Sequence, residues 1–132
     1  MKALDTNVLV RFLVNDEEVQ GRRVKSLFES AEQTGERFLI TAPVVIELLW
    51  VLSAVYGFTR GDLIEALELL SQMPIIEFEN SSSVQQLIRL GRSTRAGLPD
   101  LWIGLAGRSQ GCDATLTFEK ALPKTGLFER IY

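Results

Sequence analysis

The 132-residue sequence contains no histidine and a single cysteine, Cys112. The absence of histidine excludes imidazole acid–base catalysis and metal ligation by histidine. One cysteine cannot form an intrachain disulfide or a cysteine zinc cluster, and we expect Cys112 to be a small residue of the core. Any chemistry must therefore use carboxylates, hydroxyl groups, amines or the one thiol.

Long hydrophobic runs and a large charge excess are also lacking. No apolar stretch approaches the ~20 residues of a membrane span, and Met1 leads straight into strand-like sequence. We therefore expect a cytoplasmic protein with no membrane association. The net charge of -3 does not point to nucleic acid, although local basic clusters permit phosphate contacts. These clusters are Arg22, Arg23 and Lys25; Arg89, Arg92 and Arg95; and Lys120 and Lys124.

Apolar periodicity and helix boundary signals alternate predicted strands with predicted helices. The expected strands are 2–5, 38–41, 74–78, 114–118 and an edge strand within 127–132, and the expected helices are 7–13, 16–34, 43–56, 60–71, 84–94 and 100–109. This order predicts one α/β domain over residues 1–132, with a mainly parallel sheet of four to five strands flanked by helices. Ligands of such domains bind at the carboxyl ends of the strands.

The segment GRSQG, residues 107–111, matches the Gly-x-Ser-x-Gly pattern of hydrolase nucleophile elbows. That elbow requires a preceding strand and a histidine partner. Here a helix is expected before the serine, and the chain has no histidine. The sequence therefore argues against a serine hydrolase.

Two acidic residues follow predicted strands. Asp5 ends the first strand, and Glu119 follows the fourth. Asp5 could be a helix cap, but Thr6 and Asn7 are also good caps and stand nearer the expected helix. Asp113 lies at the opposite end of the fourth strand, so only Glu119 is expected at the carboxyl edge.

Two further acids interrupt apolar helices. The helical neighbours of Glu47 are all apolar, so we expect its carboxylate in an apolar environment that requires a partner, either a distant arginine or a shared cation. Asp100 could simply favour the helix dipole. Gly104 and Gly107 follow on the same helix, however, and we expect them to leave open space above Asp100.

Three or four carboxylates in one small volume repel one another unless a divalent cation compensates their charge. Ligation by oxygen alone favours Mg²⁺ or Mn²⁺ over zinc. Such an ion activates water and binds phosphoryl oxygens, so the residues predict a metal-dependent phosphoryl hydrolase.

The segments LDTNVLV, LPDLWIGLA and GCDATLTFEKAL, with the lone Glu47 between the first two, resemble PIN-domain ribonucleases in order and spacing. The resemblance is to the small bacterial toxins of VapBC-type toxin–antitoxin pairs and covers almost the whole chain. It implies RNA cleavage with Mg²⁺ or Mn²⁺. By position Asp5, Glu47 and Asp100 match the first three acids of the family.

The resemblance also assigns supporting residues and partners. Asn7 matches a polar residue beside the acidic pocket, and Thr117 matches a hydroxyl residue two places before the fourth acid. That acid is usually aspartate, whereas this chain has Glu119, for which we expect a water-mediated contact. The family implies a homodimer inhibited by a cognate antitoxin protein. Two alternatives stay open: a non-catalytic protein-binding module of the same fold, and a DNA or structure-specific nuclease.

Overall fold

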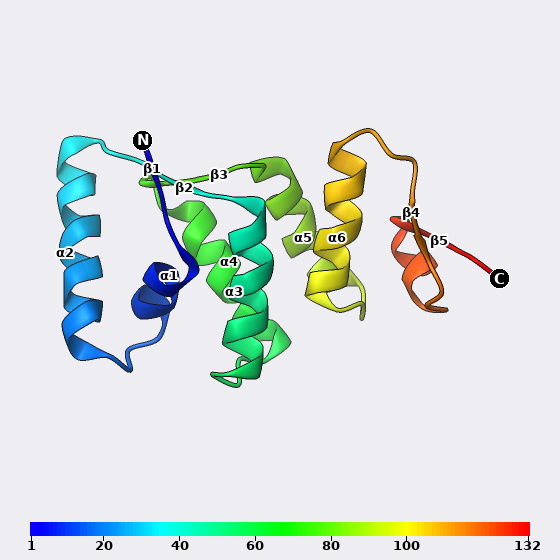
Figure 1. The fold of residues 1–132 in the computed structure, drawn as a ribbon, viewed down its shortest axis with the longest axis horizontal. Coiled ribbons are helices and arrows are strands. Elements are labelled where there is room, and N and C mark those ends of the chain that lie inside the picture. Colours follow the sequence, from blue (N-terminus) through cyan, green and yellow to red (C-terminus); the bar gives the residue numbers. More distant parts are fainter. The chain divides into compact units, whose positions relative to one another are not determined.

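The structure is a computed structural model that describes residues 1–132, and it divides into two compact units, Met1–Ser81 and Ser82–Tyr132. Each unit contains parallel strands and helices, labelled in Figure 1. The α/β fold class with parallel strands is confirmed. None of the helices is long and apolar enough to span a membrane.

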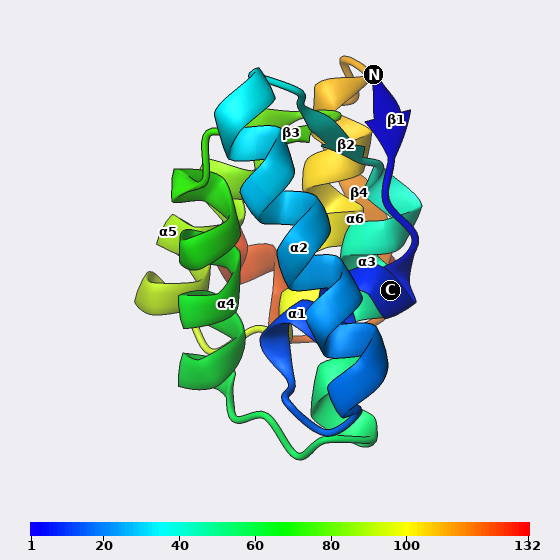
Figure 2. The ribbon, with the colours of Figure 1, turned by 90° about the vertical axis from the view of Figure 1, so that its left-hand side faces the viewer.

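The first unit contains a three-stranded parallel sheet in the order β1-β2-β3. Its strands are β1 (Lys2–Ala3), β2 (Phe38–Ile40) and β3 (Ile76–Phe78), and its helices are α1 (Thr6–Leu13), α2 (Glu18–Thr34), α3 (Ala42–Ala54) and α4 (Arg60–Gln72). Helix α1 contacts both α2 and α3, and Figure 2 shows the long helix α2 beside it. Parallel pairing places the ends of β1 and β2 at one edge, from which α1 and α3 begin.

The second unit contains a two-stranded parallel sheet. Its strands are β4 (Thr115–Thr117) and β5 (Phe128–Arg130), and its helices are α5 (Ser81–Ser93), which begins at the unit boundary, α6 (Leu98–Ser109) and the 3-10 helix η1 (Leu122–Thr125). The order of the predicted elements is confirmed, with strands of two or three residues. The sequence analysis missed η1, whose proline Pro123 has no backbone N–H to give to a strand.

Side chains of the helices explain several element boundaries. Helix α2 begins two residues later than predicted because the Glu17 carboxylate accepts hydrogen bonds from the backbone N–H groups of Val19 and Gln20. It ends where predicted, at Gly35, whose φ of 78° is left-handed. Helix α4 begins at Arg60 behind a capping box formed by Thr59 and Asp62, which confirms the predicted cap.

The cores of the two units are apolar. In the first unit, the ring of Phe28 from α2 lies 4.9 Å from the ring of Phe12 and 5.8 Å from that of Phe38, measured between centroids. In the second unit, Gly104 of α6 faces Leu127 and Phe128 of the segment that enters β5. A methyl group on Gly104 would lie 2.8 Å from a Phe128 ring carbon, so only glycine permits this close approach.

Candidate functional site

Asp5 is the N-cap of α1. Its backbone is extended, with φ -80° and ψ 158°, and its Oδ1 accepts a 2.8 Å hydrogen bond from the backbone N–H of Thr6. The expectation that Thr6 or Asn7 would cap this helix is wrong, because the helix already includes both residues. Asp5 is exposed and its Oδ2 accepts no hydrogen bond from the chain, so an oxygen remains for a cation or water.

The two residues after Asp5 have opposite environments. Thr6 is only 3% exposed, and its hydroxyl has no hydrogen-bond partner in the chain. Asn7 is exposed and lines a pocket of about 280 Å³ between α1 and α2, together with Arg11, Gln20 and other residues of these helices. Burial of an unpaired hydroxyl costs free energy, which draws attention to Thr6, a residue that sequence reasoning treated only as a cap.

Glu47 lies on the exposed side of α3. The expectation that its carboxylate stands in a buried apolar environment is wrong: Glu47 is exposed, and so are Pro43 and Trp50 on the same helical row. The buried side of α3 consists of Val45, Leu48, Leu49 and Leu52. Apolar residues occur on both sides of this helix, so the sequence did not reveal which side carries the glutamate.

Thr41 is a further polar residue at the carboxyl end of β2. It is the N-cap of α3, yet its side chain makes no cap hydrogen bond. Ala3 pairs with Leu39, and Leu4 N–H donates to the Leu39 carbonyl oxygen, so Asp5 and Thr41 follow their strands at the same level. Thr41 was missed; its position directly after a predicted strand was the available signal.

Asp100 lies in the first turn of α6, and its carboxylate folds back toward Gly97, where an added methyl group would lie 3.1 Å from Oδ2. This position suits an acid, because backbone N–H groups are free at a helix start. The expectation of open space at Gly104 and Gly107 is wrong. Phe128 and Leu127 fill the space at Gly104, and the Thr115 hydroxyl lies where a methyl group on Gly107 would stand, 2.9 Å away.

Thr117 and Glu119 are joined at the end of β4. The Glu119 backbone N–H donates a 3.1 Å hydrogen bond to the Thr117 hydroxyl oxygen, which fixes the turn that carries the exposed glutamate. Asp113, at the other end of this strand, is exposed as well. Cys112 is also exposed, so its expected place in the core is wrong; it stands in the turn between α6 and β4.

The candidate acids provide the type of donor that Mg²⁺ and Mn²⁺ require. All four side chains are exposed carboxylates, and the chain has no histidine to favour zinc. Within neither unit does a group of three or more acidic or cysteine side chains come together that could hold a metal ion. The first unit contributes Asp5 and Glu47, and the second contributes Asp100 and Glu119.

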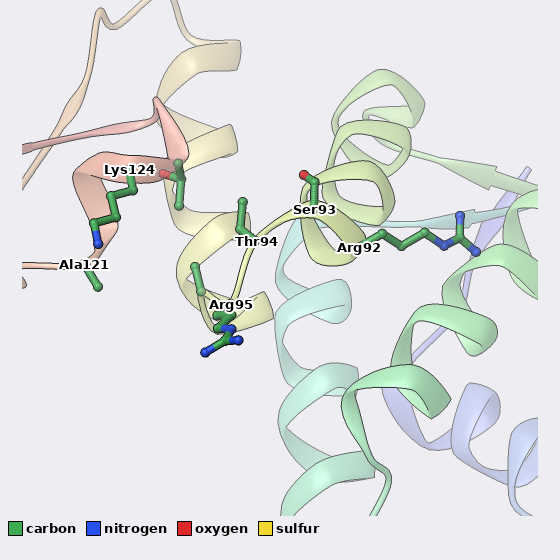
Figure 3. A pocket seen from close by; sticks show the side chains of 8 residues that line it. Arg92, Ser93, Thr94, Arg95, Ala121 and Lys124 are labelled. Carbon is green, nitrogen blue, oxygen red and sulfur yellow. The ribbon is translucent and has the colours of Figure 1, made fainter.

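The second unit also contains a basic pocket of about 560 Å³, shown in Figure 3. It is lined by Arg92, Ser93, Thr94, Arg95, Ala96, Ala121, Lys124 and Thr125. The hydroxyls of Thr94 and Thr125 donate to the carbonyl oxygens of Leu90 and Leu122, so these threonines are bound to the protein itself. In Figure 3 the side chain of Arg92 extends away from the others.

Parallel strands, short helical connections and acids at the starts of helices are found together in a known class of domain. The family model of the PIN domain matches residues 2–127, and the chain belongs to the PIN domain family. Among individual proteins it is similar to VapC ribonuclease from Aquifex aeolicus (strain VF5). The two are 27% identical over 126 residues, which cover 96% of this chain and 93% of the relative.

Proposed function

We propose that this PIN-domain protein is a metal-dependent endoribonuclease that acts as the toxin of a type II toxin–antitoxin pair. The observation that carries the proposal is the similarity to a VapC ribonuclease along 96% of the chain. The exposed carboxylates support it, since they remain accessible to an ion and to a substrate. In this proposal residues 1–132 act as one domain.

Asp5, Glu47 and Asp100 are the proposed catalytic acids, and Mg²⁺ or Mn²⁺ is the proposed cofactor. Asp5 and Asp100 would be the principal ligands of the ion. The ion would lower the pKa of a bound water and neutralise charge on the phosphate group. Glu47, on a side chain that reaches solvent, would support the ion or orient the attacking water.

Glu119, Thr117 and Asn7 have supporting roles in this proposal. The Thr117 hydroxyl holds the backbone of Glu119, so the glutamate side chain leaves the strand end in a defined direction. A glutamate places its carboxylate one methylene farther from the backbone than an aspartate, which favours contact with the ion through water. The exposed Asn7 amide can donate to an RNA oxygen.

A cognate antitoxin is the proposed protein partner, and the exposed row of α3 is its proposed contact. Pro43, Glu47 and Trp50 form an apolar row with one acid, which is complementary to a segment with one basic side chain among apolar ones. We also propose that the protein is a cytoplasmic homodimer. Trp50 and Val55, each 62% exposed, show that apolar surface is available for such contacts.

Cleavage assays test the ribonuclease proposal. Purified protein should cut single-stranded RNA with Mg²⁺ or Mn²⁺ and should stop in excess EDTA. Asp5→Asn should abolish cleavage while the circular dichroism spectrum stays unchanged, and Asp113→Asn, which changes another exposed acid, should leave cleavage intact. Binding of the antitoxin without cleavage of any nucleic acid would identify a non-catalytic module, and cleavage of DNA alone would identify a deoxyribonuclease.

Analytical ultracentrifugation tests the dimer separately. A homodimer should sediment at twice the mass of the 132-residue chain at micromolar concentration. A monomer at all concentrations would contradict the dimer and leave the ribonuclease proposal unaffected.

A further inference from the structure

The basic pocket of the second unit contains two cationic side chains that form no ion pair. Arg95 extends from the connection between α5 and α6, and Lys124 extends from η1 (Figure 3). Both are exposed, and the two ion pairs of the chain lie elsewhere, between Arg11 and Asp16 and between Arg37 and Glu77. Two unneutralised cations beside one pocket of about 560 Å³ favour an anionic ligand.

The two walls of this pocket continue into the segments that carry two candidate acids. Arg95 precedes Asp100 by five residues, and Ala121, which lines the opposite wall, follows Glu119 by two. Both connections belong to the second unit. An anion bound here is therefore held by the same two segments that position Asp100 and Glu119, as expected for a substrate phosphate next to the one that is cleaved.

A third feature of these segments is the exposed ring of Phe118, directly before Glu119. Its side chain is 75% exposed, and Leu116 on the same strand is 61% exposed. Phe118 lies three residues before Ala121, so their Cα atoms are at most about 11 Å apart. Exposed aromatic rings beside cationic grooves stack on the bases of single-stranded nucleic acid.

We propose that Arg95, Lys124 and Phe118 form a binding site for single-stranded RNA, in which the two cations hold phosphate groups and the phenylalanine ring stacks on a base. This site deepens the proposed ribonuclease function and rests on it. The cations alone would also suit an acidic peptide. The exposed aromatic ring favours RNA, because every nucleotide offers a flat base beside its phosphate and an acidic side chain does not.

Equilibrium binding without cleavage tests this site directly. Fluorescence anisotropy of a short fluorescein-labelled single-stranded RNA, in EDTA and at several salt concentrations, measures affinity and its salt dependence. The double variant Arg95→Ala/Lys124→Ala should bind roughly tenfold more weakly at low salt, and the slope of log K against log salt should decrease by about 1. Phe118→Ala should weaken binding roughly fivefold or more and leave that slope unchanged.

Matched variants separate the site from general charge and apolar effects. Arg89→Ala and Lys120→Ala remove exposed cations that do not line the pocket, and Leu116→Ala removes an exposed apolar side chain of the same strand as Phe118. All three should bind within about twofold of the unmodified protein. Equal losses in these controls, or unchanged binding by the pocket variants, would overturn the site.

Two further arms distinguish the remaining possibilities. A pocket deficit that appears with polyglutamate but not with RNA would assign the pocket to an acidic protein and overturn the proposal. The binding assay in EDTA is independent of cleavage. A protein that binds RNA through this site but cuts no RNA with Mg²⁺ or Mn²⁺ would therefore contradict the proposed ribonuclease and support the site, whereas a protein that cuts RNA with unchanged pocket variants would do the opposite.

Discussion

Helices α3 and α6 are alike in sequence and differ in how they use it. Each has a proline at its second position, begins without a side-chain cap hydrogen bond and carries one candidate acid. Each also buries a row of apolar residues. In α3 the acid Glu47 lies in the middle of the helix, on an exposed row with Pro43 and Trp50. In α6 the acid Asp100 lies in the first turn.

The difference separates an acid with a local structural role from one without. Asp100 is favoured by the free N–H groups and the dipole at the start of α6, whether or not it binds a metal. Glu47 has no such local reason, and its apolar neighbours are exposed to solvent. An acid surrounded by apolar residues in sequence is therefore not a buried acid, and for Glu47 the explanation must come from a ligand or a partner.

The largest expected effect concerns the two acids themselves. If Asp100 is a principal metal ligand and Glu47 a supporting group, Asp100→Asn should lower the RNA cleavage rate by about 100-fold or more and Glu47→Gln by roughly tenfold. Initial rates with Mg²⁺ and with Mn²⁺ measure both. A larger loss for Glu47→Gln would reverse the roles assigned to the two helices.

A second comparison concerns the exposed apolar residues of the two helices, Trp50 on α3 and Ile103 on α6. Trp50 is 62% exposed and Ile103 is 48% exposed. If the antitoxin covers the row of Glu47, Trp50→Ala should cost about 2 kcal/mol of binding, roughly 30-fold in Kd. Ile103→Ala should change Kd by less than about threefold. Titration calorimetry with the purified antitoxin measures both, and equal losses would place the contact elsewhere.

The order of the elements, the Gly35 terminus and the Thr59 cap followed from the sequence because each depends on residues close together in the chain. The side of α3 that faces solvent did not follow, since apolar residues surround Glu47 in every direction. The role of Gly104 was also misjudged. Whether a glycine borders a cleft or a neighbouring strand depends on Phe128, which is 24 residues away in the sequence.

Gly104 provides a third difference between the two helices. A methyl group at Gly104 would lie 2.8 Å from Phe128 and 2.9 Å from Leu127, so Gly104→Ala should lower the free energy of unfolding by roughly 1–3 kcal/mol despite the better helix propensity of alanine. Ser53→Ala, at an exposed position of α3, should change it by less than about 0.5 kcal/mol. Urea denaturation measures both, and a stabilised Gly104→Ala would show that α6 and β5 are not in close contact.

The smallest effect concerns how α3 begins. Thr59 accepts a hydrogen bond from Asp62 N–H at the start of α4, so Thr59→Ala should cost about 1 kcal/mol. Thr41 makes no such bond, and Thr41→Ala should cost less than about 0.5 kcal/mol. A comparable loss in both variants would mean that Thr41 does cap α3.

The pH dependence of the Thr59 cap follows from Asp62. Hydrogen bonds from the backbone N–H and the side chain of Thr59 lower the pKa of Asp62 from its ordinary value of 3.8. A carboxyl group with a lowered pKa in the folded state stabilises the fold above that ordinary value, and the contribution is lost as the pH falls through the lowered pKa. The stability difference between the unmodified protein and Thr59→Ala should therefore be full near about pH 6 and smaller near about pH 3, measured as the urea midpoint. The small effect of Thr41→Ala should not vary with pH, because no carboxylate takes part at the start of α3. A Thr59→Ala difference that stays constant to acid pH would show that the Asp62 carboxylate contributes nothing to the cap.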